Sequence, residues 1–150
     1  MKGLIEYLSR VGKSRGFGIQ SPWAYSFVRE VIFETCPYYA YKEIDKRVKS
    51  KKDREWARLH FRIANFVNPK QCVELSLSNC SVDDITLVLS QSDSVGVVIL
   101  TNIHESKETE SRLEEIKDDT KVGVVFDLYD EIICFPPSME RPKQYYKLNF

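Results

Sequence analysis

The sequence predicts an α/β domain in which a helical N-terminal part, residues 1–70, packs on a small mixed sheet built by residues 71–150. Two patterns lead to this prediction. Apolar residues recur at helical spacing before Pro69, and strand-like and helix-like segments alternate after it. The 150 residues are 43% hydrophobic and 12% aromatic, which is enough for one core and excludes an unfolded chain. We therefore expect the two parts to form one compact unit.

Helices account for most of the N-terminal part. Ser21 and Pro22 favour a helix start, because serine caps free N–H groups and proline suits the first turn, and Pro37 would end this helix. Residues 49–53 are interpreted as a solvated linker. The expected segments are Leu4–Val11, a glycine-rich break over 12–20, a helix from Ser21 to Pro37, a short amphipathic segment with Ile44 and Val48, and a helix over 53–67 closed by Asn68 and Pro69.

Strands alternate with helices after Pro69. Strand–helix–strand–helix–strand favours a parallel sheet, and two neighbouring strands near the end favour an antiparallel hairpin. Ser81 is positioned to cap the first of these helices. The expected elements are strand 71–77, a helix after Ser81, strand 95–100, helix 106–118, strands 122–128 and 131–135, and a terminal strand 145–150.

Composition restricts the chemistry of the chain. Apolar stretches such as Val97–Leu100 are far shorter than the roughly 20 residues of a membrane span, and no signal peptide is expected. The 4 cysteines match no zinc or redox spacing, so Cys72 and Cys134 are interpreted as buried free thiols in a cytoplasmic protein. With 2 histidines in the chain, no metal site is expected.

Charge is divided between the two halves of a chain whose net charge is zero. Residues 1–75 carry 15 Lys and Arg against 8 Asp and Glu, a net charge of +7, and residues 76–150 carry 7 against 14, a net charge of −7. Arg54, Arg58 and Arg62 recur every four residues and form a candidate basic ridge for a polyanion. The alternative is the solvated face of an amphipathic helix. No recognised nucleic-acid-binding motif accompanies the ridge, so the sequence disfavours a nucleic-acid partner without excluding one.

Three stretches carry a resemblance to a known family. They are Gly16–Pro22 with Pro37–Tyr41, then Val73–Cys80, and finally Ile99–Phe135. In them the chain resembles the class I S-adenosylmethionine-dependent methyltransferases, in a bacterial subgroup with a helical N-terminal extension. The first stretch is similar to that extension, the second to the family's first strand and cofactor loop, and the third to its late strands. The resemblance implies a truncated Rossmann-like methyltransferase fold.

The loop after the first strand departs from the family's pattern. That pattern is an acidic residue followed by spaced glycines, because the backbone must approach the ligand where a Cβ would intrude. Glu74 stands at the acidic position, whereas Ser76 and Cys80 stand at the glycine positions with Ser78 between them. The resemblance implies that Glu74, Ser76, Ser78 and Cys80 are the remnant of an S-adenosylmethionine-binding loop.

The chain also resembles an internally deleted member of the family. The 14 residues Ser81–Ser94 separate the loop from the next strand, whereas one strand–helix–strand unit takes about 30 residues. Neither the carboxylate that holds the cofactor ribose nor the strand beside the adenine has a candidate position. The side of the first strand on which the family has a further strand would then be vacated. With the missing units removed, the family's strand order predicts 71–77 beside 95–100, then 131–135 and 122–128, with 145–150 extending that edge.

Asn102 and His104 form a candidate polar site after the second strand. Relatives often carry paired acidic residues there, and their replacement by Thr101 and Asn102 argues against metal ligation. His104 remains in register with the family. A catalytic base needs a positioned substrate and an orienting partner, neither of which the sequence identifies, so His104 is interpreted as a residue that caps or packs at a helix start. No catalytic residue is assigned.

Three functions remain open at this point. The loss of the glycines and of the ribose carboxylate favours a methyltransferase-like pseudoenzyme that lacks catalysis, has no cofactor and serves an interaction or regulatory role. One alternative is a methyltransferase that binds S-adenosylmethionine in a reduced site. The other is a polyanion-binding module that uses the basic helical half. The vacated side of strand 71–77 predicts a homodimer, because open sheet edges are covered or paired.

Overall fold

The computed structural model describes residues 18–150 together with Ile5, Leu8 and Arg10, and it shows a mixed α/β fold with a five-stranded sheet. The predicted segment Leu4–Val11 therefore lies largely outside the described residues. The strands are β1 (Cys72–Ser76), β2 (Val97–Thr101), β3 (Val125–Asp127), β4 (Ile132–Cys134) and β5 (Tyr145–Lys147). Their order is β1-β2-β4-β3-β5, as expected from the sequence. β1 pairs in parallel with β2 and β3 with β5, whereas β4 is antiparallel to both β2 and β3.

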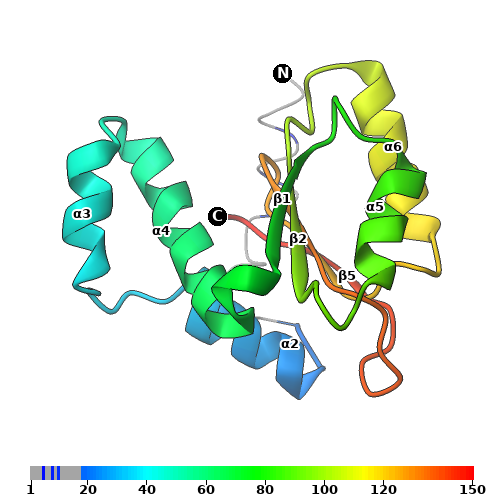
Figure 1. The fold of residues 1–150 in the computed structure, drawn as a ribbon, viewed down its shortest axis with the longest axis horizontal. Coiled ribbons are helices and arrows are strands. Elements are labelled where there is room, and N and C mark those ends of the chain that lie inside the picture. The colour runs from blue at the N-terminus through cyan, green and yellow to red at the C-terminus, as the bar shows by residue number, and fades with distance from the viewer. Residues whose placement is uncertain (1–4, 6–7, 9, 11–17) are drawn as a thin grey trace.

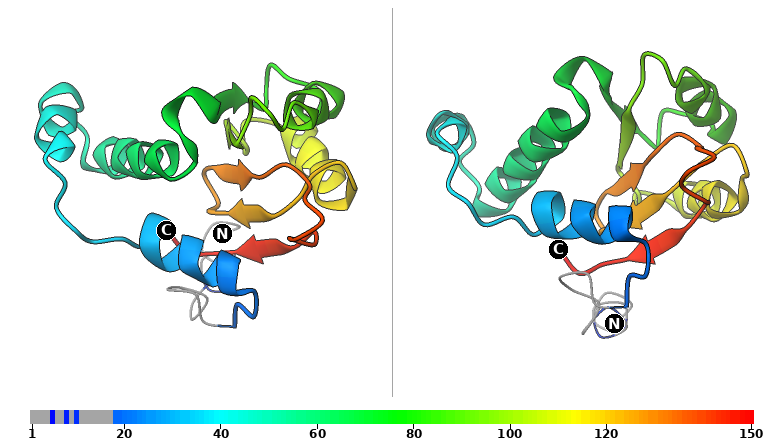
Figure 2. Two further views of the ribbon diagram at one scale, coloured as in Figure 1. Left: turned by 60° about the horizontal axis from the view of Figure 1, so that its bottom comes forward. Right: turned by 90° about the horizontal axis from the view of Figure 1, so that it is seen from below.

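Helices cover both faces of this sheet (Figures 1 and 2). One face packs against α2 (Pro22–Phe27), the π-helix η1 (Val28–Ile32) and α4 (Lys51–Val67). The other face packs against α5 (Val82–Ser90) and α6 (Lys107–Asp118). The α3 helix (Ala40–Arg47) packs against α4, and a short 3-10 turn, η2 (Pro69–Gln71), leads from α4 into β1. The helical N-terminal part and the sheet thus share one core.

Serine N-caps begin four of these helices. Ser21, Ser50, Ser81 and Ser106 each accept a hydrogen bond from the backbone N–H three residues later. Such caps satisfy donors that have no partner within the helix, and each contributes about 1 kcal/mol. The starts expected at Ser21 and Ser81 are confirmed.

Two helix boundaries differ from the expectation. Residues 49–53 are not a linker, because Ser50 caps α4 and Lys51 is its first residue. The helix that begins at Pro22 ends at Ile32 and not at Pro37, because the chain widens into η1, whose closing bond runs from the Phe33 N–H to the Val28 oxygen at 2.9 Å. Phe33, with a φ of −104° and a ψ of 21°, leaves the helical conformation, so the helix stops there.

Aromatic rings from both parts of the chain fill the core between α2 and the sheet. Trp23 meets Phe135 edge-on with ring centroids 4.9 Å apart, and Phe27 lies 4.9 Å from Phe126 and 5.1 Å from Phe135. Phe27, Phe126 and Phe135 are buried. Rings in such geometries add to the free energy gained by burying them, so this cluster joins α2 firmly to β3 and β4.

Candidate functional site

Four of the five strands point the same way, so their carboxyl ends lie at one edge of the sheet, where the chain passes from β1 to α5 (Figure 1). In open α/β sheets, ligands bind outside the carboxyl ends of the strands. The loops that reach this edge are 77–80 after β1, 102–106 after β2 and 128–131 after β3. The first two of these loops contain residues that the sequence singled out.

Ser76, Ser78 and Asn102 meet at this edge and form one polar cluster. The Ser76 and Ser78 hydroxyls lie 2.8 Å apart, and the Asn102 side-chain N–H group donates to the Ser76 hydroxyl at 2.8 Å. Asn102 has a φ of 56°, a left-handed conformation that asparagine tolerates better than most residues. The cluster links the tips of β1 and β2, and its hydroxyls and amide already serve as one another's partners.

An arginine from α6 closes the loop after β1. Arg112 donates through Nη1 to the backbone oxygens of Leu77 at 2.7 Å and Cys80 at 2.9 Å, with that of Ser78 at 3.4 Å. Its Nη2 pairs with Glu108 at 2.5 Å. The backbone oxygen of Cys80, a predicted cofactor residue, is therefore a hydrogen-bond acceptor for Arg112. Its spacing of four residues from Glu108 is the one signal for Arg112 in the sequence.

The start of α5, directly after this loop, is occupied by the protein's own carboxylate. Asp84 accepts from the Ser81 N–H at 2.9 Å and from the Ser81 hydroxyl at 2.7 Å, and the Asp84 N–H donates to that hydroxyl at 3.1 Å. These hydrogen bonds lower the pKa of Asp84. Such a capping box satisfies donors that would otherwise attract an anionic ligand. A hollow of about 390 Å³ beside it is lined by Ser81, Val82, Asp83, Glu108, Ser111, Arg112, Glu115 and Asp119.

His104 lies at the same edge but faces away from the serine cluster. Its Nε2 is 2.9 Å from the backbone oxygen of Tyr129, and its Nδ1 is 3.6 Å from the Glu110 carboxylate. Its ring packs on the Tyr129 ring with centroids 4.3 Å apart. Both ring nitrogens thus face protein groups, an arrangement that favours the structural interpretation over a catalytic base. Asn102 and His104 do not form one site, because the first contacts the β1 loop and the second the β3–β4 turn.

A buried ion pair that the sequence did not predict joins Arg10 to Asp127, next to the Tyr129 ring. Arg10 Nη2 is 2.9 Å from Asp127 Oδ1, and Arg10 Nη1 donates to the backbone oxygens of Asp127 at 2.9 Å and Leu148 at 3.1 Å. The Tyr145 hydroxyl donates to the other Asp127 oxygen. Burial and the Asp127 charge raise the pKa of Tyr145, which therefore stays protonated. The network ties Arg10 to β3 and to the residue that follows β5.

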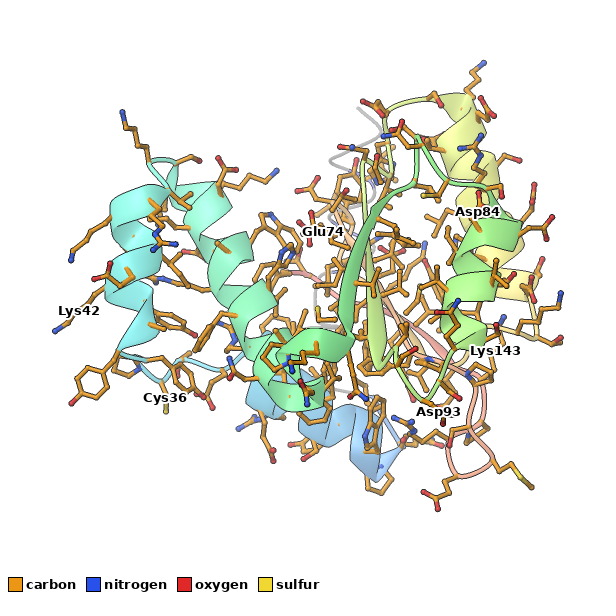
Figure 3. The ribbon with its side chains drawn as sticks, viewed as in Figure 1. Cys36, Lys42, Glu74, Asp84, Asp93 and Lys143 are labelled. Atoms are coloured by element: carbon orange, nitrogen blue, oxygen red, sulfur yellow. The ribbon has the colours of Figure 1, made fainter. Side chains whose placement is uncertain are left out.

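Glu74 does not join the serine loop. It projects from β1 toward α4, as Figure 3 shows, and its carboxylate lies 3.6 Å from His60 Nδ1, while His60 Nε2 is 2.6 Å from Glu131. Burial lowers the pKa of His60, but the hydrogen bond to Glu131 and the charges of Glu131 and Glu74 outweigh it, so the pKa lies above its ordinary value. His60 therefore links α4 to the sheet through charge.

Two of the three arginines of the predicted basic ridge bind groups within the protein. Arg58 makes a bidentate pair with Asp45 at 2.5 and 3.2 Å. Arg62 donates to the backbone oxygens of Val31 at 2.5 Å and Ile32 at 3.0 Å, and so satisfies carbonyls at the end of η1. Arg54, the third member, is half-buried. Helical spacing placed the arginines on one helix correctly, but this side of α4 packs against α3 and η1.

The metal-ligating side chains of the described part of the chain form no large group. No group of three or more His, Cys, Asp or Glu side chains there is placed to hold a metal ion. The four cysteines are unpaired, and burial raises the pKa of Cys134 to about 12, as expected for a buried thiol, whereas Cys72 is half-buried. Among the described helices, none is long and apolar enough to cross a membrane.

Comparison with protein families, with curated proteins and with solved structures finds no match to this chain. The mixed α/β fold and its strand order therefore rest on the structure itself. The resemblance to methyltransferases stays a prediction.

Proposed function

We propose that this protein is a methyltransferase-like pseudoenzyme that has lost its cofactor site and acts by binding other macromolecules. The observation that carries the proposal is the closure of the loop after β1 by Arg112, which holds the backbone oxygens of Leu77 and Cys80. The serine cluster and the capping box of α5 support it. The groups that a cofactor would use at this edge are already hydrogen-bonded within the protein.

The cost of reopening this loop argues against cofactor binding. A hydrogen bond to a charged group contributes about 1.5–3 kcal/mol, and Arg112 makes two with good geometry. A ligand that displaced them would lose that free energy from its own affinity. The side chains of Ser76 and Cys80 also occupy space that glycines would leave to the ligand.

Calorimetric titration with S-adenosylmethionine and S-adenosylhomocysteine tests this proposal. We expect no heat of binding and no thermal shift at millimolar ligand. Arg112→Met is the matched variant, since it keeps the apolar stem and removes the guanidinium. Micromolar binding to the wild-type protein would refute the loss of the site, whereas binding to the variant alone would identify Arg112 as the group that closes it.

The interaction role is proposed to use the outer edge of β1, with which no strand among the described residues pairs. The Gln71 oxygen accepts from the Gly96 N–H at 2.8 Å and the Leu77 N–H donates to the Thr101 oxygen at 3.0 Å, so odd-numbered residues between them face β2. The backbone groups of Cys72 and Glu74 then point outward. Among the described residues, β2 is the strand paired with β1, and Figure 1 shows β1 in front of it between α4 and α5.

We propose that a second copy pairs with this edge to form a homodimer. Light scattering of the purified protein measures the expected mass. Glu74→Pro removes one outward N–H group and is tolerated on an edge strand, while Glu74→Ala removes the same carboxylate and keeps the N–H. We expect the proline variant to be monomeric and the alanine variant dimeric. A monomeric wild-type protein, or equal masses for the two variants, would refute pairing through β1.

A further inference from the structure

The α3–α4 hairpin carries a dense group of exposed cations. It stands at the end of the molecule opposite α5 and α6 (Figure 1), and its residues 42–52 include six Lys or Arg and two acidic residues. Both acidic residues are paired within the hairpin: Glu43 with Lys46 at 2.8 Å and Asp45 with Arg58 at 2.5 Å. We call residues 38–52 the basic arm. No residue of α3, which the structure describes in full, is buried.

One face of the basic arm combines cations with an exposed aromatic ring. Tyr39, Lys42 and Lys46 follow one another at helical spacing on the side of α3 that faces away from α4. Tyr39 is 91% exposed, and Lys42 Nζ lies 5.9 Å from the centroid of its ring. Figure 3 shows Lys42 pointing away from α4 into solvent. Tyr39 thus places an exposed aromatic face beside a cation, a combination that can stack with an unpaired base and hold its phosphate.

Three further cations of the basic arm lie where the helix dipole does not favour them. Lys49, Lys51 and Lys52 surround the start of α4, the positive end of a 17-residue helix, where the helix dipole disfavours cations. Lys52 pairs with Asp130 at 2.7 Å, whereas Lys49 and Lys51 are exposed. Their charge lowers the stability of the helix, and an anion bound to the arm would recover that loss.

The acidic half restricts where such an anion can bind. Residues 76–150 carry a net charge of −7, and Figure 3 places Asp84 at the end of the molecule opposite Lys42. A polyanion is therefore repelled from α5 and α6 and attracted to the basic arm, which orients its approach.

We propose that the basic arm binds single-stranded nucleic acid, with phosphates at Lys42, Arg47, Lys49 and Lys51 and an unpaired base stacked on Tyr39. The negative charge of the phosphates complements the cations. An unpaired base can stack on the exposed ring, whereas an acidic polypeptide or a paired duplex would make no use of that ring. This site is separate from the edge of β1 and from the loop that Arg112 closes. It goes beyond the proposed function and does not depend on it.

Fluorescence anisotropy of a labelled oligothymidylate of about 20 nucleotides, titrated with the full-length protein, tests this site. We expect affinity in the micromolar range at about 50 mM salt, with a log–log salt slope of about −0.7 for each phosphate held. Lys42→Glu with Lys49→Glu should weaken binding at least about tenfold and reduce that slope. The matched control, Lys107→Glu with Lys121→Glu, makes the same change in net charge on exposed lysines of the acidic half and should keep most of the affinity.

Tyr39→Leu tests the stacking separately and should cost at least about fivefold in affinity for the oligothymidylate. Circular dichroism of each variant shows that the fold is kept. Absence of binding at low salt would overturn the proposal, as would equal losses in the arm variant and its control. Equal affinity for duplex DNA or polyaspartate, with no effect of Tyr39→Leu, would overturn the single-stranded assignment and identify the arm as a general polyanion surface.

Discussion

Arg112 provides a direct measure of how firmly the loop after β1 is closed. Arg112→Met removes two good hydrogen bonds, to Leu77 and Cys80, and a third whose 3.4 Å length makes it weak. At about 1.5 kcal/mol for each good bond to a charged group, the free energy of unfolding should fall by about 3 kcal/mol. The ion pair to Glu108, whose carboxylate is 72% exposed, adds little to this loss.

Urea unfolding followed by tryptophan fluorescence measures this loss, and a thermal scan should show a fall in Tm of about 6–12 °C for a chain of this length. Glu108→Gln is the matched control, because it removes the exposed pair and keeps the bonds to the loop; its expected cost is at most about 0.5 kcal/mol. If Arg112→Met unfolds within about 0.5 kcal/mol of the wild-type protein, the bonds to the loop contribute nothing. A cofactor would then meet no measurable cost in opening the loop.

Three further substitutions test other parts of the structure. Asp127→Asn breaks the buried pair with Arg10 and should cost about 3–5 kcal/mol in urea unfolding; a loss below about 1 kcal/mol would show that the pair is not formed. Gly123→Ala places a methyl group 2.4 Å from the Pro136 oxygen, and should destabilise by about 1–3 kcal/mol, unlike an exposed alanine substitution. The raised pKa of His60 means that its charged form stabilises the fold below the ordinary pKa and that this contribution is lost as pH rises through the folded-state pKa. The stability difference from His60→Gln should therefore shrink between pH 6 and pH 9, and a constant difference would contradict the ion pairs.

Local patterns predicted the elements of this fold well. Serine caps and proline starts act within one helical turn, so Ser21 and Ser81 mark real helix starts in the sequence. The strand order was obtained from a resemblance and from the short segment Ser81–Ser94, not from the strands themselves. One boundary failed although its signal was local, because Ser50 caps α4 within the segment interpreted as a linker. The other failure involves a contact far away in the chain. The helix after Pro22 ends early at η1, whose carbonyls bind Arg62, a residue 30 positions later.

The candidate site was harder to predict than the fold for the same reason. Ser76, Ser78 and Asn102 meet because parallel strands bring their ends together, which a strand order is enough to foresee. Arg10 and Asp127 are 117 residues apart, and no pattern in the sequence around either residue indicates a buried pair. The partners of Glu74 likewise depend on how α4 crosses the sheet. Polar residues that serve long-range contacts resemble surface residues in the sequence, so the roles of Arg58, Arg62 and His60 could be found only in the structure.

The two proposals assign different roles to the polar residues at the two ends of the molecule. At the carboxyl edge of the sheet, Arg112 and Asp84 bind backbone groups of their own chain, so polar atoms there stabilise the fold and not a ligand. At the basic arm the opposite holds, because Lys49 and Lys51 lie at the positive end of α4 and lower its stability. Selection for stability alone would remove those lysines and would keep Arg112. We therefore expect selection for binding to act on the basic arm. We do not expect it at the sheet edge that corresponds to the cofactor site of methyltransferases.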